Sequence, residues 1–129
     1  MVELMVPISP GELIDKITIL EIKSQRMTDP AKLHNVRTEL SLLTDTWKAS
    51  PYAATDISAE WAALRGVNAK LWDIEDDIRD KERSRLFDAG FIELARAVYV
   101  TNDERAAIKK QINTRLGSAL VEEKSYAKY

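Results

Sequence analysis

One predicted helix carries polar side chains on the side that its apolar residues mark as core-facing. Over residues 58–87 the apolar residues that recur at helical spacing are Trp61, Leu64, Val67, Leu71, Ile74 and Ile78. Asn68, Glu75 and Glu82 fall inside the same arc of the helical wheel. Arg79 lies within reach of both carboxylates. Because polar residues on an apolar stripe conflict with the hydrophobic pattern, we take these four as candidate ligand-binding residues.

Three interpretations of this polar stripe are open. In the first, Glu75 and Glu82 form a partly buried carboxylate pair that Arg79 orients toward a cation or a polar ligand, and burial raises one carboxylate pKa enough for acid–base chemistry. In the second, the three side chains form an internal network that fixes the register of the helix. In the third, the end of the helix leaves the bundle, so that Glu82 is solvated.

The rest of the sequence offers little further chemistry. There is no cysteine and the single histidine is His34, which excludes Cys-ligated zinc, thiol catalysis and a multi-histidine metal site within one chain. No glycine-rich phosphate loop, nucleophile elbow or zinc motif is present. We therefore expect no catalytic set, no metal site and no cofactor.

The sequence contains two further charged groups. The first lies opposite the apolar stripe on residues 58–87, is expected to be a solvated face, and consists of Asp73, Asp76, Asp77 and Asp80. The second is a set of basic residues near the C-terminus, Arg105, Lys109, Lys110 and Arg115. These basic residues are not expected to share one helix face, which argues against a phosphate-binding stripe.

Composition limits the class of protein. The chain has 129 residues, of which 45% are hydrophobic and 31% charged, and its net charge is −2. This fits one domain over residues 1–129 and argues against a nucleic-acid partner. The N-terminus lacks the pattern of a signal peptide, and no stretch approaches the roughly 20 apolar residues of a membrane-spanning helix. We expect a cytoplasmic protein without membrane insertion.

Helix-start signals predict an antiparallel hairpin near the N-terminus. Ser9-Pro10-Gly11-Glu12 is a capping box with proline at the first helical position, and it starts a helix that runs to about Met27. The same type of signal at residues 28–30 starts a second helix almost at once, which makes the two helices antiparallel. The first helix is apolar on more than one side. It is therefore either the central element or half of a dimer interface.

The remaining elements complete an all-α fold. The long helix over residues 58–87 is followed by two shorter helices, over residues 91–100 and 101–117, the second opened by another capping box. Residues 1–8 form a short extended arm that lies across the bundle or pairs with a second copy. Residues 118–129 form a polar tail. The predicted fold is a helical hairpin packed on the long helix, with two shorter helices after it.

Three stretches of sequence carry a family resemblance. They are ISPGELIDKITILEIK at residues 8–23, LWDIEDDIR at residues 71–79 and EEKSY at residues 122–126. Along essentially the whole chain the sequence resembles an uncharacterised family of short, all-helical bacterial proteins that contain a domain of unknown function. The resemblance implies a bacterial origin and assigns no ligand or catalytic residue.

Two enzyme families with helical folds do not match. The chain resembles the all-helical chorismate mutases only through Ile14-Asp15 and Arg26, and it lacks their upstream arginine. The helical nucleotide pyrophosphohydrolases pair acidic motifs across two helices. Residues 75–80 could supply one motif, but the acidic residues of the first helix lack the required spacing.

The sequence therefore predicts a non-enzymatic interaction or assembly module that acts as a homodimer or with a protein partner. The reasons are that the first helix is apolar on more than one side and that the extended arm has no partner strand within the chain. The alternative is a small helical enzyme or ligand-binding protein that uses Asn68, Glu75, Arg79 and Glu82, with or without a divalent cation.

Overall fold

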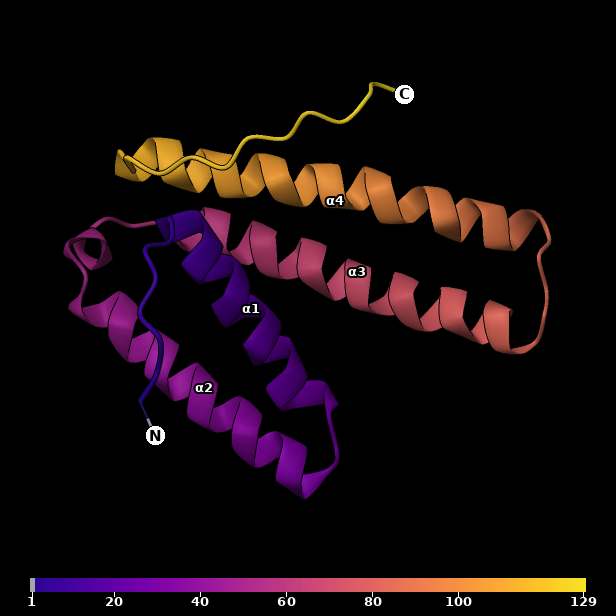
Figure 1. Cartoon of the computed structure of the whole chain (residues 1–129), viewed down its shortest axis with the longest axis horizontal. Helices are drawn as coiled ribbons and strands as arrows, with labels where there is room; N and C mark the ends of the chain where they lie inside the picture. Colours follow the sequence, from indigo (N-terminus) through magenta and orange to yellow (C-terminus); the bar gives the residue numbers. More distant parts are fainter. Residues whose placement is uncertain (1) are drawn as a thin grey trace.

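The computed structural model describes residues 2–129, and Met1 of the predicted arm lies outside them. Its elements are α1 (Pro10–Arg26), α2 (Pro30–Ala49), the 3-10 turn η1 (Pro51–Ala54), α3 (Ser58–Arg83) and α4 (Ala89–Leu116) (Figure 1). Over the described range there is no strand, so the predicted all-α class is confirmed. None of the described helices combines the length and apolar character needed to cross a membrane.

The predicted helix starts of the N-terminal hairpin are confirmed. Ser9 Oγ accepts a hydrogen bond from the amide of Glu12 at 3.2 Å, and an Asp29 carboxylate oxygen accepts one from the amide of Lys32 at 3.0 Å. Each cap is followed by a proline whose missing amide proton costs nothing at that position. The connection over residues 27–29 is short, and α1 and α2 consequently pack side by side (Figure 1).

α1 is the central element of the structure. It contacts α2, α3 and α4, which explains why its sequence is apolar on several sides. The apolar core lies around it and consists of Leu13, Ile14, Ile17, Trp47, Ile57, Leu64 and Ile112. Of the two roles predicted for this helix, the structure therefore assigns it the central one.

The predicted break between two short C-terminal helices is wrong, because α4 is continuous from Ala89 to Leu116. Asp88 caps its start by accepting a hydrogen bond from the amide of Phe91 at 3.0 Å, and Gly117 ends it with a left-handed φ of 67°. Thr101, the expected cap residue, is only 1% exposed within the helix. Packing of α4 against α3 and α1 overrides a capping signal that is local to residues 101–104.

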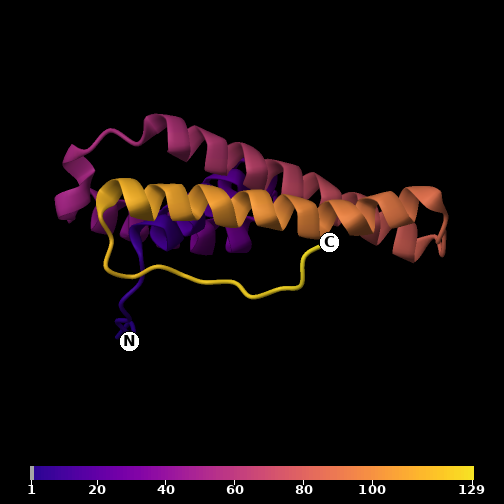
Figure 2. The same cartoon turned by 90° about the horizontal axis from the view of Figure 1, so that it is seen from above.

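The outer ends of α3 and α4 extend past α1 and α2 (Figure 1). α3 ends at Arg83, four residues earlier than predicted, and Arg85 takes a left-handed φ of 56° in the connection to α4. After Gly117 the tail turns back and runs beside α4 (Figure 2). The arm at residues 2–8 is not helical, and Val2 and Leu4 are more than nine-tenths exposed.

A close approach between α1 and α4 explains the glycine at position 11. The Gly11 amide donates a hydrogen bond to Asn113 Oδ1 at 2.7 Å, which satisfies one of the free amides at the start of α1. A Cβ at this position would lie 2.5 Å from the carbonyl oxygen of Lys109. The two helix backbones meet here without room for a side chain.

We expect Gly11→Ala to lower the free energy of unfolding by about 1–3 kcal/mol, because the added methyl forces α1 away from α4. Urea unfolding followed by circular dichroism measures the change. Gly66→Ala is the matched control: a Cβ there meets no atom within 4 Å, and alanine in an exposed helix interior should stabilise by about 0.5–1 kcal/mol. Equal stability of the two variants would contradict the close approach.

Candidate functional site

The structure places three of the four predicted site residues, Asn68, Glu75 and Arg79, along one groove and leaves Glu82 outside it. Asn68 is 6% exposed and faces α1. Glu75 pairs with Arg79 at the surface, where their side chains are 43% and 71% exposed. Glu82 is exposed in the last turn of α3. The predicted internal Glu–Arg–Glu network is therefore wrong, and the interpretation of a solvated helix end is confirmed for Glu82.

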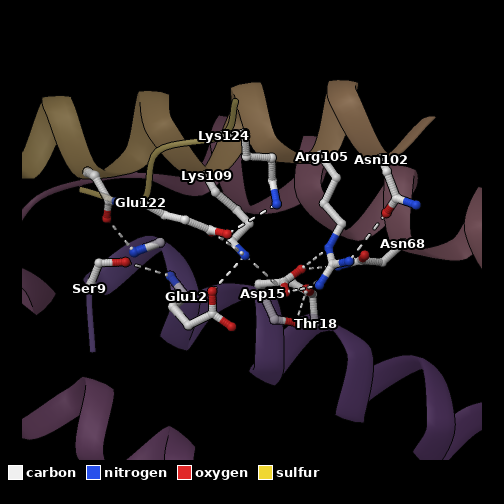
Figure 3. A network of polar contacts seen from close by, with 12 residues as sticks. Ser9, Glu12, Asp15, Thr18, Asn68, Asn102, Arg105, Lys109, Glu122 and Lys124 are labelled. Atoms are coloured by element: carbon white, nitrogen blue, oxygen red, sulfur yellow. Dashed lines mark hydrogen bonds and ion pairs between the residues drawn. The ribbon is translucent and has the colours of Figure 1, made fainter. Parts of the chain in front are cut away.

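A buried carboxylate occupies the centre of the molecule instead. Asp15, on the second turn of α1, is 1% exposed. Its carboxylate binds Arg105 of α4 through both oxygens: Nε donates to Oδ1 at 2.9 Å and Nη2 donates to Oδ2. Asn68 Nδ2 of α3 donates to the same Oδ1 at 2.9 Å and to Thr18 Oγ1 at 3.0 Å (Figure 3). Three helices thus meet at one carboxylate.

Lys109 extends this network to the C-terminal tail. Its Nζ lies 2.6 Å from Glu12 Oε2, 3.7 Å from Asp15 Oδ2 and 3.5 Å from Glu122 Oε2 (Figure 3). Glu122 belongs to the tail, so one ammonium group holds together the start of α1 and the chain beyond α4. We call Glu12, Asp15, Asn68, Arg105 and Lys109 the Asp15 network.

The electrostatics of the network favour the ionised states of Asp15, Arg105 and Lys109. Burial by itself raises the pKa of Asp15, but hydrogen bonds from Arg105 and Asn68 and the charges of Arg105 and Lys109 outweigh it, and the pKa lies below its usual 3.8. Burial likewise disfavours the charged form of Lys109, yet the hydrogen bond to Glu12 and the charge of Asp15 raise its pKa overall. The hydrogen bond to Asp15 raises the pKa of Arg105.

Local spacing positions these groups. Glu12 and Asp15 are three residues apart on α1, and Arg105 and Lys109 are four apart on α4, so each pair lies on one helix face. The expectation that the C-terminal basic residues do not share a face is wrong for Arg105 and Lys109. A signal for the network was present in the sequence: Asp15 stands among Leu13, Ile14 and Ile17, where an isolated carboxylate needs a cationic partner.

Two open grooves flank Arg105. The first, of about 490 Å³, contains three of the predicted site residues, Asn68, Glu75 and Arg79, together with Trp72. The second, of about 860 Å³, lies between α4 and the tail. Arg105 and Asn102 line both. A ligand in either groove would therefore reach a guanidinium group that the buried aspartate holds in place. Among residues 2–129 no three His, Asp or Glu side chains are grouped closely enough to hold a metal ion.

A protein-family model described as a family of unknown function matches residues 4–129, which is essentially the whole chain. No curated protein and no solved structure matches the sequence. The matched range includes the positions of every member of the Asp15 network. The family description assigns no role to any residue, so the functional argument depends on geometry.

We expect Asp15→Asn to lower the free energy of unfolding by about 3–5 kcal/mol near neutral pH, because it leaves the guanidinium of Arg105 without its counter-charge and Lys109 without one of its three carboxylate neighbours. The pKa of Asp15 is lowered by folding, so its stabilisation is complete above 3.8 and is lost as the pH falls through the folded value. The difference between wild type and variant should therefore shrink in acid. Urea titrations of both proteins at a series of pH values measure it.

Glu75→Gln is the control for this experiment. It removes one carboxylate from an exposed ion pair, for which we expect a change below about 1 kcal/mol. A wild type and an Asp15→Asn variant of equal stability near neutral pH would show that the network does not hold the helices together.

Proposed function

The chain belongs to the DUF6165 family of unknown function, and we propose that it is a non-enzymatic assembly module that forms a homodimer through the outer ends of α3 and α4. One observation carries the proposal: within residues 75–100 no residue is buried. Yet this segment contains many large apolar side chains, which are Ile78, Leu86, Phe87, Phe91, Ile92, Leu94, Val98, Tyr99 and Val100.

The apolar surface at this end is unusual for a monomer. Phe87 is 55% exposed, Leu86 51% and Ile92 57%. Water contact of so many neighbouring apolar groups is unfavourable, and in soluble proteins such patches mark interaction surfaces. The rings of Phe87 and Phe91 stack edge to face at 5.2 Å, which presents a preformed aromatic surface between the ends of the two helices.

The total surface area supports association. The chain exposes 8947 Å², whereas a compact monomer of 14.6 kDa is expected to expose about 6,900 Å². Each partner in an interface of standard size buries about 800 Å². The excess over a compact monomer is shared among the exposed arm, the tail and the outer ends of α3 and α4, and it is larger than the area that one partner buries in such an interface.

A second copy of the α3–α4 pair is the partner that fits best. Two helices alone have only one shared face and cannot enclose a core, whereas two helical hairpins form a four-helix bundle. A twofold axis would place the same apolar residues of both copies against each other. Residues 75–100 carry acidic and basic side chains in mixed order, so two copies would not meet with a single sign of charge.

We expect the wild type to have about twice its chain mass of 14.6 kDa in size-exclusion chromatography with light scattering, and Ile92→Glu to be a folded monomer. Ile92 is 57% exposed, and a carboxylate in its place would lose its hydration on association. Leu42→Glu is the matched control, because Leu42 lies on α2 and is 47% exposed, and this variant should remain dimeric. A wild type that is monomeric at all concentrations would refute the proposal.

The groove at Asn68, Glu75 and Arg79 supports a second candidate function, the binding of a small polar ligand. Its walls combine carboxylates and guanidinium groups with the ring of Trp72, over which the Arg26 guanidinium lies at 5.9 Å from the centroid. Pockets of this size with a few convergent polar groups commonly bind small molecules. Glu82, the fourth residue of the predicted stripe, does not line the groove.

A thermal-shift screen with Mg²⁺, Mn²⁺, nucleotides and sugar nucleotides tests this candidate. We expect one ligand, at about a hundred times its dissociation constant, to raise the melting temperature by several degrees. Glu75→Gln should abolish the shift, whereas Glu82→Gln, on the same stripe but outside the groove, should keep it. A screen without any shift, or a shift that survives Glu75→Gln, would count against the candidate.

A further inference from the structure

The C-terminal tail is attached to α4 at two separate points. Near its start, Glu122 lies 3.5 Å from Lys109. At its end, the hydroxyl of Tyr129 donates to Asp103 Oδ2 at 2.6 Å, and its ring packs edge to face on Tyr99 at 5.0 Å. Between these points the tail runs beside α4 as a strap (Figure 2).

The second groove, of about 860 Å³, lies beneath this strap and has the size of a small-molecule site. α4 contributes Asn102, Arg105 and Lys109 to it, and the tail contributes Lys124, Tyr126 and Lys128. One wall of the groove is helix and the other is tail. An occupant would therefore be contacted on opposite sides by two different segments of the chain.

The basic side chains of the groove favour an anionic occupant. Arg105, Lys109, Lys124 and Lys128 line it, and the one acidic residue of the lining, Asp103, accepts the hydrogen bond from Tyr129. Arg105, Lys109 and Lys124 also pair with carboxylates of Asp15, Glu12 and Glu122. Arg105 uses Nε and Nη2 for Asp15, while Nη1 has only a long hydrogen bond of 3.5 Å to Asn102. Within residues 2–129 Lys128 forms no ion pair. Donors from both walls are therefore available to one anion.

The remaining lining favours a flat ring. Tyr99, Tyr126 and Tyr129 all border the groove, and the residues Tyr126 and Tyr129 are 79% and 76% exposed. Exposed aromatic faces stack on planar heterocycles with little dependence on their identity. Several N–H donors that approach from different directions suit the tetrahedral oxygens of a phosphate group.

We propose that the groove between α4 and the tail binds a phosphorylated ligand that carries a flat ring, with a nucleoside monophosphate as its simplest form. Arg105 and Lys128 hold the phosphate from opposite walls, and the tyrosines hold the ring. The site shares Tyr99 with the proposed dimer surface and Asn102 and Arg105 with the groove at Glu75. Tyr126 and Lys128 line this groove alone, so variants at these two positions test it independently of the other two proposals.

Isothermal titration calorimetry of the full chain with AMP and UMP tests the proposal, with inorganic phosphate and adenosine as partial probes. Both nucleotides should bind more tightly than either partial probe. Lys128→Gln and Tyr126→Ala should each weaken nucleotide binding by about tenfold. Lys110→Gln is the matched control and should bind normally, because Lys110 is on α4 but lies outside the groove, 3.7 Å from Glu123. Glu75→Gln should also bind normally.

Proteolysis locates the ligand independently. Trypsin cleaves after Lys124 and Lys128, and a ligand that joins both walls should slow release of the tail fragments, as measured by mass spectrometry. The proposal is overturned if no nucleotide binds, if binding is unchanged in Lys128→Gln and Tyr126→Ala, or if phosphate or adenosine alone binds as tightly as the nucleotides.

Discussion

The carboxylate of Asp15 is the constraint on which the inner half of the structure depends. It lies among apolar residues of α1, and removing an isolated ion from water costs several kcal/mol. Arg105 and Lys109 of α4 and Asn68 of α3 offset that cost only if their atoms lie within hydrogen-bonding distance. The requirement fixes how α3 and α4 are placed against α1. Because Lys109 also lies close to Glu122, it fixes the start of the tail as well.

The inner half of the α3–α4 pair packs against α1, whereas the outer half has no further helix to pack against. The inner half surrounds α1, and apolar side chains such as Leu64 and Ile112 become fully buried there. The outer half has the same amphipathic construction, yet α1 and α2 do not reach it (Figure 1). Its apolar residues are therefore left half-exposed, because two helices cannot enclose a core without a further layer. The exposed apolar residues of this half extend from the connection between α3 and α4 to Val100, which is five residues before Arg105 of the Asp15 network.

Local signals in the sequence predicted the helix class, the N-terminal hairpin and the caps at Ser9 and Asp29, since each depends on residues a few positions apart. The positions of Glu75 and Glu82 could not be predicted in the same way. A helical wheel shows that they share an arc with Asn68, but exposure depends on whether a neighbouring helix covers that arc. α1 covers it at Asn68 and does not reach Glu82. The pairing of Asp15 with Arg105 joins residues 90 apart, and only tertiary structure reveals it.

Arg105 connects the structural role of the network to ligand binding. Its Nε and Nη2 atoms serve the buried aspartate, and its Nη1 atom, directed toward Asn102, has hydrogen-bonding capacity left at the junction of the two grooves. A guanidinium group held in this way loses little further side-chain entropy when it binds an anion. The same aspartate neutralises the charge of Arg105. Arg105 therefore orients a bound anion more than it adds to the electrostatic attraction of that anion. Affinity for an anion must then depend on groups without a fixed counter-charge, and in the groove beneath the tail Lys128 is such a group.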